Sequence, residues 1–372
     1  MKKILFLIHD LGQGGAEKVL VNLVNNMDFS KYEITVMTLF GGGVNEQFLS
    51  EKVKLINIFS NTIPGNSKLM KFFSPAILHK LFIKDFYDVE IAYLEGPSAR
   101  IISGSQDKKT KLFCWIHSEQ RNISHMSYAF RSKSEAIKCY KKFDEIICVS
   151  ESIKKDFSAI INDLKKVEVL YNTVESEKIK ELSKEKVEEI VDNGYPIIIA
   201  VGSLKPIKGF DRLLRVVKRL IDNQVYLKLY ILGKGPLEDS LKKYVSDNNL
   251  QEYVSFLGYQ LNPYKYIDRA DLFVCSSWSE GFSTAVTEAL IVGTPVCTVD
   301  VPGMKELLGD KNEYGVITEN SDDALYDGMF KLLNDKKLLR EYQEKAKERG
   351  LMFSSDITVG AVEKVLDEVT ER

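Results

Sequence analysis

The sequence predicts an α/β protein made of two doubly wound domains, each built on a parallel sheet. Short runs of apolar, often β-branched residues recur along the chain, as is typical of parallel strands buried on both faces. Segments long enough for crossover helices separate these runs. A strand, a glycine-containing turn and a helix follow one another near Gly12 and again near Gly202. With 372 residues, the chain has room for two such domains.

The first domain is predicted over residues 1–172. Its apolar first strand, Ile4–Ile8, leads into the turn Gly12–Gly15, and a helix-spaced segment follows. This geometry suits phosphate binding, although a ligand-free turn explains the same glycines. Glu17 stands where a dinucleotide-binding loop has its third glycine, so that fingerprint is absent. The further strands are expected at Ile34–Leu39, Val53–Ile58, Glu90–Leu94, Lys111–Ile116, Glu145–Val149 and Val167–Leu170.

The segment Lys68–Phe86 combines lysines with phenylalanines and leucines, and Pro75 is expected to split it into two short helices. A basic, aromatic amphipathic stretch can lie on an anionic membrane. An ordinary pair of core-facing helices is the alternative. Residues 1–171 carry a net charge of +5 and the remainder −7. The basic first half suggests an anionic surface or acceptor, although chance also explains this asymmetry.

His117 follows the predicted strand Lys111–Ile116. Ligands of open α/β sheets bind beyond the carboxyl ends of the strands, so His117 is a candidate pocket residue. A structural role is the usual one for a single histidine.

A linker is predicted at residues 173–195, with a charged helical stretch at Glu175–Asp192, and the second domain at 196–352. The last segment, 353–372, is expected to be a helix that crosses back to the first domain. The strands of the second domain are predicted at Pro196–Val201, Tyr226–Leu232, Val254–Leu257, Asp271–Cys275, Pro295–Val299 and Val316–Thr318, and its later helices at Asp322–Leu333, Lys336–Arg349 and Asp356–Thr370.

Two lysines, Lys205 and Lys208, lie in the glycine-containing loop after the first strand of this domain. They could clamp a diphosphate, or they could be solvated surface lysines. The next strand ends in a glycine loop at Gly233, and Glu238 occupies the third glycine position there. An NAD-dependent dehydrogenase is therefore not expected.

The segment Ser276–Glu288 combines a strand end, a glycine turn and a helix N-terminus. Its two acids, Glu280 and Glu288, stand eight residues apart, which is about 12 Å along a helix. They are too far apart to share one proton, but they could hold the two ends of one long ligand with a phosphate between them. A turn acid and a helix-surface acid without a ligand is the alternative.

Composition limits the class of protein. The five cysteines form no C-x-x-C pair and lie mostly in apolar runs, which favours reduced thiols in a cytosolic protein. The apolar run after Lys2-Lys3 is too short for a signal peptide, and no run reaches transmembrane length. We expect a cytoplasmic protein at the inner face of the plasma membrane, without a nucleic-acid partner.

Taken together, these residues resemble the retaining family 4 glycosyltransferases, which have the GT-B fold. The resemblance covers the whole chain, and the last matching segment is the family's E-x7-E signature. The matching segments, in order, are Gly14–Glu17, Trp115–His117, Val149–Glu151, Tyr171-Asn172, Gly202 with Lys208-Gly209, Gly233–Pro236, Phe256–Gly258 and Glu280–Glu288.

The resemblance implies two Rossmann-like domains facing across a cleft, with a nucleotide-diphosphate sugar bound by the C-terminal domain. Glu280 would hold hydroxyls of the donor sugar, Glu288 the ribose, and Lys208 the diphosphate leaving group. His117 would lie next to the sugar or the acceptor. The catalytic candidates are thus Glu280, His117 and Lys208. The implied donor-binding residues are Gly14, Gly15, Ser203, Lys205, Lys208, Gly233, Gly258, Tyr259, Glu280, Gly281, Phe282, Ser283, Thr284 and Glu288.

The implied reaction moves a hexose-type sugar from a UDP-sugar to a hydroxyl of a lipid-linked glycan acceptor in surface polysaccharide biosynthesis. Lysines, backbone N–H groups and a helix dipole can stabilise the leaving diphosphate without a metal. No Asp-x-Asp motif occurs, and we expect neither a metal nor a cofactor besides the donor. By resemblance, the acceptor hydroxyl attacks from the front face and passes its proton to the leaving phosphate, with retention.

Two positions depart from the family. Ser203 replaces an arginine that usually follows the glycine, and Lys205 is a candidate to supply the missing charge. Ser283 replaces a common proline. The first departure leaves open a non-catalytic GT-B subunit that binds a nucleotide sugar or a partner enzyme. A GT-B sugar-nucleotide epimerase is disfavoured, because the chain has only four histidines for acid and base chemistry.

Overall fold

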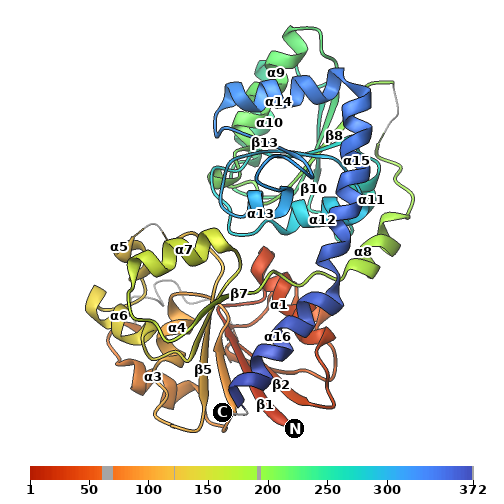
Figure 1. The fold of residues 1–372 in the computed structure, drawn as a ribbon. Helices are drawn as coiled ribbons and strands as arrows, with labels where there is room; N and C mark the ends of the chain where they lie inside the picture. The colour runs from red at the N-terminus through yellow and green to blue at the C-terminus, as the bar shows by residue number, and fades with distance from the viewer. Residues whose placement is uncertain (61–69, 121, 191–193, 371–372) are drawn as a thin grey trace. The chain divides into compact units, whose positions relative to one another are not determined.

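The computed structural model of the chain describes residues 1–60, 70–120, 122–190 and 194–370. It divides into two compact units: unit 1 is Met1–Val174 with Ser355–Arg372, and unit 2 is Glu175–Ser354 (Figure 1). Each unit contains one parallel sheet covered by helices. The predicted fold class, with two Rossmann-like parallel-sheet domains, is confirmed.

The described strands of unit 1 form a seven-stranded parallel sheet in the order β3-β2-β1-β4-β5-β6-β7. The interior strand β1, between β2 and β4, is buried from Ile4 to Ile8, which explains its continuous apolar run. The strands are β1 Lys2–Ile8, β2 Tyr32–Phe40, β3 Lys54–Phe59, β4 Val89–Ala92, β5 Lys111–Ile116, β6 Glu145–Cys148 and β7 Val167–Val169. The helices are α1 Gly15–Asn26, η1 Glu46–Phe48, α3 Pro75–Phe82, α4 Pro97–Ile102, α5 Ile123–Met126, α6 Lys133–Tyr140, α7 Glu151–Ile160 and α16 Ser355–Thr370.

The C-terminal helix α16 packs in unit 1, where it lies against α1 (Figure 1). Its apolar stripe, which includes Val362 and Leu366, is buried. Asp367 on the same helix bonds to Lys2 Nζ at 2.9 Å and to the Tyr32 hydroxyl at 2.8 Å. The apolar and polar residues of this amphipathic helix therefore both have partners in unit 1, among β1, β2 and α1.

The described strands of unit 2 form a six-stranded parallel sheet in the order β10-β9-β8-β11-β12-β13. The strands are β8 Ile197–Val201, β9 Lys228–Leu232, β10 Val254–Gly258, β11 Leu272–Cys275, β12 Val296–Val299 and β13 Val316–Thr318. The helices are α8 Ser176–Ser183, η2 Pro206–Lys208, α9 Phe210–Asp222, α10 Glu238–Asp247, α11 Tyr264–Asp268, α12 Thr284–Val292, α13 Met304–Leu308, α14 Asp322–Asn334, α15 Lys336–Gly350 and η3 Leu351–Phe353.

The segment predicted as a linker differs from its prediction. The expected helix over Glu175–Asp192 is wrong in its extent, because α8 ends at Ser183. This helix packs against α11 and α12 and belongs to unit 2. Asn262 helps to fix its end, donating to Leu182 O at 2.9 Å. Residues 184–190 are not helical, and their side chains bond to the α11 region instead: Glu185 accepts from Asn262 at 3.0 Å and Glu189 from the Tyr266 hydroxyl at 2.9 Å. Residues 191–192 of the expected helix lie outside the described residues.

The described part of the basic aromatic segment, residues 70–86, contains α3, which begins at Pro75 as expected. Ser74 caps this helix by accepting from Ile77 N. Residues 68–69 of the predicted Lys68–Phe86 segment lie outside the described residues.

Candidate active site

In each unit, the strand order reverses next to the first strand of the sheet. The reversal lies between β1 and β4 in unit 1 and between β8 and β11 in unit 2. Ligands of doubly wound sheets bind at such switch points, outside the carboxyl ends of the strands. In unit 2 the loop after β8 carries Lys208, and the loop after β11 carries Glu280.

The structure brings Lys208 and Glu280 together. Lys208 Nζ lies 2.6 Å from Glu280 Oε1, and Ser277 Oγ donates to the same oxygen at 2.5 Å. The Glu280 side chain is 10% exposed and that of Lys208 is 29% exposed. Burial lowers the pKa of Lys208, but the adjacent Glu280 carboxylate outweighs it, so the net pKa lies above the ordinary lysine value. A charged lysine and a charged carboxylate thus meet at the switch point.

The N-terminus of α12 follows directly. Ser283 caps this helix by accepting from Val286 N at 3.4 Å, so the residue that replaces the family's proline has a capping function. Phe282 is buried against Phe353, with ring centroids 6.0 Å apart. Gly303 presses against the Gly281 carbonyl with φ of +81°, where a β-carbon would collide with that oxygen. Three contacts therefore fix the turn that presents the first backbone amides of α12: the Ser283 cap, the packing of Phe282 and the close approach of Gly303.

Glu288 lies on α12 and is 4% exposed, whereas Thr284 at the start of the helix is partly exposed. Glu280 in the turn and Glu288 on the helix are thus both largely buried in the same strand–turn–helix element.

The remaining predicted donor loops follow the neighbouring strands β8, β9 and β10. Gly202 N donates to Leu232 O at 3.0 Å, and Gly233 N donates to Gly258 O at 2.7 Å. These bonds join the three loops side by side at the carboxyl edge of the sheet. Tyr259, which follows Gly258, is exposed, as is Lys205, and Ser203 is partly exposed.

In unit 1 the switch point carries the other predicted residues. Gly14 and Gly15 are exposed at the start of α1, after β1. His117 follows β5, whose neighbour β4 leads to Glu95. Glu95 Oε2 accepts from His117 N at 3.0 Å, and its Oε1 accepts from Ser118 Oγ.

The side chain of His117 packs against Tyr93, with ring centroids 4.8 Å apart. Its Nε2 is buried and has no hydrogen-bond partner in the part of the chain that the structure describes. Burial lowers the pKa of His117 to about 3, so the imidazole is neutral near pH 7. His117 can therefore donate or accept a hydrogen bond without carrying charge.

Several residues of these loops were not predicted from the sequence. Ser277 bonds to Glu280, and Glu95 bonds to the backbone of His117. Glu95 could have been predicted, because it directly follows a predicted strand. Arg212 and Trp278 gave no signal, because only the tertiary structure stacks them.

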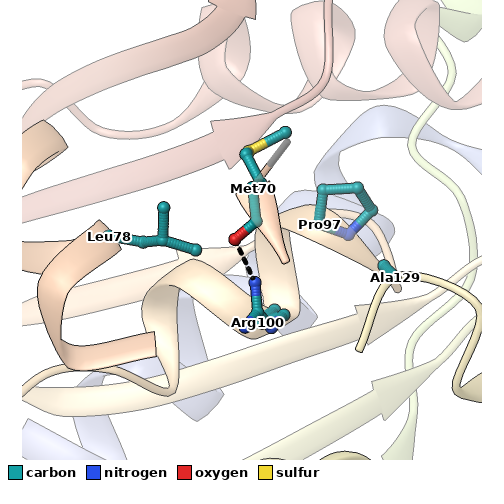
Figure 2. Close-up of a pocket in the computed structure, with 5 residues that line it drawn as sticks. All are labelled: Met70, Leu78, Pro97, Arg100 and Ala129. Carbon is teal, nitrogen blue, oxygen red and sulfur yellow. Dashed lines mark hydrogen bonds between the residues drawn. The ribbon is translucent and has the colours of Figure 1, made fainter. Parts of the chain in front are cut away.

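Two further features concern the described residues. They include no cluster of three or more His, Cys, Asp or Glu side chains arranged to hold a metal ion. None of their helices combines the length and apolar character needed to cross a membrane. A small pocket in unit 1 is lined by Met70, Leu78, Pro97, Arg100 and Ala129 (Figure 2), and it contains no predicted site residue.

Comparison with known proteins decides the family. Residues 13–178 match the model "Glycosyltransferase Family 4", and residues 182–349 match "Glycosyl transferases group 1". A Campylobacter jejuni N-acetylgalactosamine-N,N'-diacetylbacillosaminyl-diphospho-undecaprenol 4-alpha-N-acetylgalactosaminyltransferase is 30% identical over 368 residues, covering 95% of this chain and 96% of the relative. The chain belongs to the family 4 type of GT-B glycosyltransferases.

Other relatives agree with this assignment. A second C. jejuni enzyme, a GalNAc-alpha-(1->4)-GalNAc-alpha-(1->3)-diNAcBac-PP-undecaprenol alpha-1,4-N-acetyl-D-galactosaminyltransferase, is 26% identical over 359 residues and covers 94% of both chains. The crystal structure of Anabaena HepE in complex with UDP-glucose aligns with a TM-score of 0.77 at 17% identity, over 99% of this glycosyltransferase and 100% of that chain. The last similarity establishes the fold alone.

Proposed function

We propose that this glycosyltransferase moves a hexose-type sugar from a UDP-sugar to a hydroxyl of a lipid-linked glycan acceptor, with retention and without a metal. The observation that supports this most directly is the Lys208–Glu280 pair with Ser277 at the switch point of unit 2. It combines a cation for a leaving diphosphate with a carboxylate for sugar hydroxyls, beside the N-terminus of α12.

In the proposed reaction, the bond between the anomeric carbon and the UDP oxygen breaks, and the acceptor oxygen bonds to the same face of that carbon. The acceptor proton passes to the leaving phosphate. Lys208 and the first amides of α12 stabilise the negative charge that develops on the diphosphate. On donor binding, Lys208 exchanges part of its contact with Glu280 for phosphate oxygens, and Glu280 accepts from sugar hydroxyls. Glu288 holds the ribose.

The remaining donor contacts are proposed from the loops at the carboxyl edge of the sheet. The loops at Gly202, Gly233 and Gly258 are proposed to contact the nucleotide, and Gly233 lets two of them pack closely, because a β-carbon there would collide with the Gly202 carbonyl. Lys205 is exposed at this edge and supplies charge where Ser203 stands in place of arginine. Neutral His117, with Gly14 and Gly15, contributes to the sugar and acceptor side.

The nature of the acceptor is proposed from the relatives. Both C. jejuni enzymes are named for acceptors linked to diphospho-undecaprenol. The HepE complexes contain UDP and UDP-glucose, which favours uridine as the base of the donor. We therefore propose a place for this enzyme in surface polysaccharide biosynthesis, at the inner face of the plasma membrane.

The test is incubation with UDP-glucose, UDP-galactose, UDP-GlcNAc and UDP-GalNAc and with synthetic polyprenyl-diphosphate-linked glycans. We expect transfer from one of these donors, an α-linked product by NMR, and unchanged rates in EDTA. Glu280→Ala should lower kcat at least about 100-fold, the magnitude typical for a group that acts mainly in the transition state. Donor binding without turnover by the wild type would instead support a non-catalytic subunit.

A contact with the membrane is proposed for residues 71–86 of unit 1. Phe72 is 80% exposed, and four further large apolar side chains in this stretch are 42–49% exposed: Phe73, Ile77, Leu81 and Phe86. Lys80 and Lys84 are exposed beside them on or just after α3. Exposed apolar side chains with lysines beside them fit an anionic lipid bilayer.

The turn that carries Phe72 is held rigidly. Buried Arg100 donates to Met70 O at 2.9 Å and to Phe73 O at 2.7 Å (Figure 2 shows the first bond). Arg131 donates to the carbonyls of Lys71 at 2.6 Å and of Phe72 at 2.7 Å. Such a turn keeps an aromatic anchor extended into solvent at little entropic cost on binding.

Vesicle co-sedimentation tests this contact. Wild type should sediment with vesicles containing phosphatidylglycerol and less with pure phosphatidylcholine. Phe72→Ser should reduce sedimentation severalfold. Phe48→Ser serves as the matched control, because Phe48 is 44% exposed in the same unit but outside this stretch. Equal loss in both variants, or none in Phe72→Ser, would contradict the proposal.

A further inference from the structure

Arg212 on α9 is fully buried although it carries a charge. Its Nη1 donates to Asn320 Oδ1 at 2.6 Å and its Nε to Asp322 Oδ1 at 3.2 Å. Nη2 is buried without a hydrogen-bond partner among the described residues. Burying a guanidinium with an unsatisfied donor costs free energy that an apolar side chain would not. Its presence therefore calls for a role beyond filling space.

The guanidinium of Arg212 stacks on the ring of Trp278, with Cζ 3.3 Å from the ring centroid. Trp278 is 43% exposed, so its indole covers the guanidinium from solvent. Tryptophan gives the strongest cation–π contact of the aromatic side chains, and desolvation strengthens it. This contact joins α9 to the loop after β11, two residues before Glu280.

The same loop is tied to the segment that carries Lys208. Trp278 N donates to Ile207 O at 2.8 Å, and Ser276 Oγ donates to Lys208 O at 3.2 Å. Gly209 lies so close to the Ser276 carbonyl that a β-carbon there would collide with it. Arg212 follows Gly209 by three residues, so its stacking on Trp278 is a further link between the Lys208 segment and the loop after β11.

We propose that the Arg212–Trp278 contact is a positioning contact that fixes the loops of Lys208 and Glu280 in the register that donor binding and transfer require. Both residues act through the loops, and neither is assigned a contact with substrate. The inference rests on the proposed function for its kinetic consequences, but its consequences for donor binding can be measured separately.

The structure supplies a matched control on the same helix. Arg219 of α9 stacks on Tyr326 of α14, with Cζ 4.5 Å from the ring centroid, and pairs with Asp323 at 2.7 Å. This second cation–π contact joins α9 to α14 and includes no residue of the Lys208 or Glu280 loops. Trp278→Leu and Tyr326→Leu each remove one ring and keep an apolar side chain.

The experiment measures the dissociation constants of UDP and of the best-bound of the four UDP-sugars by calorimetry, together with kcat where turnover occurs. Trp278→Leu should raise the dissociation constants of both UDP and the UDP-sugar at least 10-fold, because the Lys208 segment that it positions binds the diphosphate and the Glu280 loop binds the sugar. It should also lower kcat at least 10-fold, since small misplacements of reacting groups are costly. Trp278→Phe, which keeps a ring, should recover to within about 3-fold of wild type, and Arg212→Lys should behave as an intermediate.

Tyr326→Leu should leave all these quantities within 2-fold of wild type. The inference is overturned if Trp278→Leu binds UDP and the UDP-sugar as wild type does, or if Tyr326→Leu has the same effect as Trp278→Leu. Absence of transfer by the wild-type protein would overturn the proposed function instead, while the binding comparison would still decide the role of Trp278. If Trp278→Leu does not fold, Arg212→Lys, which should bind UDP and the UDP-sugar more weakly than wild type, is compared with Tyr326→Leu instead.

Discussion

Replacing Lys208 with methionine tests the ion pair at the switch point of unit 2. The substitution keeps most of the aliphatic volume and removes the charge that lies 2.6 Å from Glu280 Oε1. The Glu280 carboxylate is left 10% exposed with the Ser277 hydroxyl and, at 4.0 Å, the weakly donating Cys275 thiol as its side-chain donors. A mostly buried carboxylate that loses its cation is destabilised because it can neither regain water nor find a new partner.

The magnitude follows from this geometry. Hydrogen bonds to charged groups contribute about 1.5–3 kcal/mol, and the partial exposure of Lys208 places the expected loss near 2 kcal/mol. For a domain of this size, that loss corresponds to a fall in Tm of about 4–8 °C. Removing the cation from the leaving group should also lower kcat about 100- to 1000-fold.

The assay combines thermal unfolding with the transfer reaction for Lys208→Met, Glu280→Gln and the double variant. In the double variant, stability should return to within about 1 kcal/mol of wild type, because no unpaired buried charge remains, while activity stays lost. Lys205→Met is the matched control, since this lysine is exposed in the same loop and should change Tm by less than about 2 °C. An unchanged Tm in Lys208→Met, or strictly additive losses in the double variant, would refute the assigned role of the pair.

Three more outcomes are expected. The pKa of His117 is lowered to about 3, whereas an unfolded histidine has a pKa near 6.5. Protons therefore bind the unfolded state more readily, and the folded state loses stability as the pH falls from 6.5 toward 3. Between pH 7.5 and 5 the free energy of unfolding of the wild type should fall by about 1–2 kcal/mol more than that of His117→Gln in denaturant titrations. Gly303→Ala should cost about 1–3 kcal/mol, because φ is +81° and the new β-carbon meets Gly281 O, whereas Gly360→Ala in open space on α16 should be neutral or stabilising in thermal unfolding. Glu95→Gln should lower kcat about 10-fold with little change in Tm, because Glu95 fixes His117 N and Ser118; an unchanged kcat would remove Glu95 from the acceptor side.

Local patterns in the sequence were sufficient for the two sheets. Every predicted strand has a counterpart, because a strand buried on both faces needs a continuous apolar run such as Ile4–Ile8. The helix over Glu175–Asp192 was overextended, because the local pattern does not show the tertiary contacts of Glu185 with Asn262 and of Glu189 with Tyr266, made where residues 184–190 leave the helix.

The sequence also determined which residues stand at the carboxyl ends of the strands, and hence that Lys208, Glu280 and His117 are candidates. Only the tertiary structure decided which of them meet. The Lys208–Glu280 bond joins residues 72 positions apart, and the stacking of Arg212 on Trp278 joins α9 to a loop with which no local pattern connects it. Pairing of this kind depends on strand order and on the depth to which each side chain is buried, and both are set by packing of the whole domain rather than by neighbours in the chain.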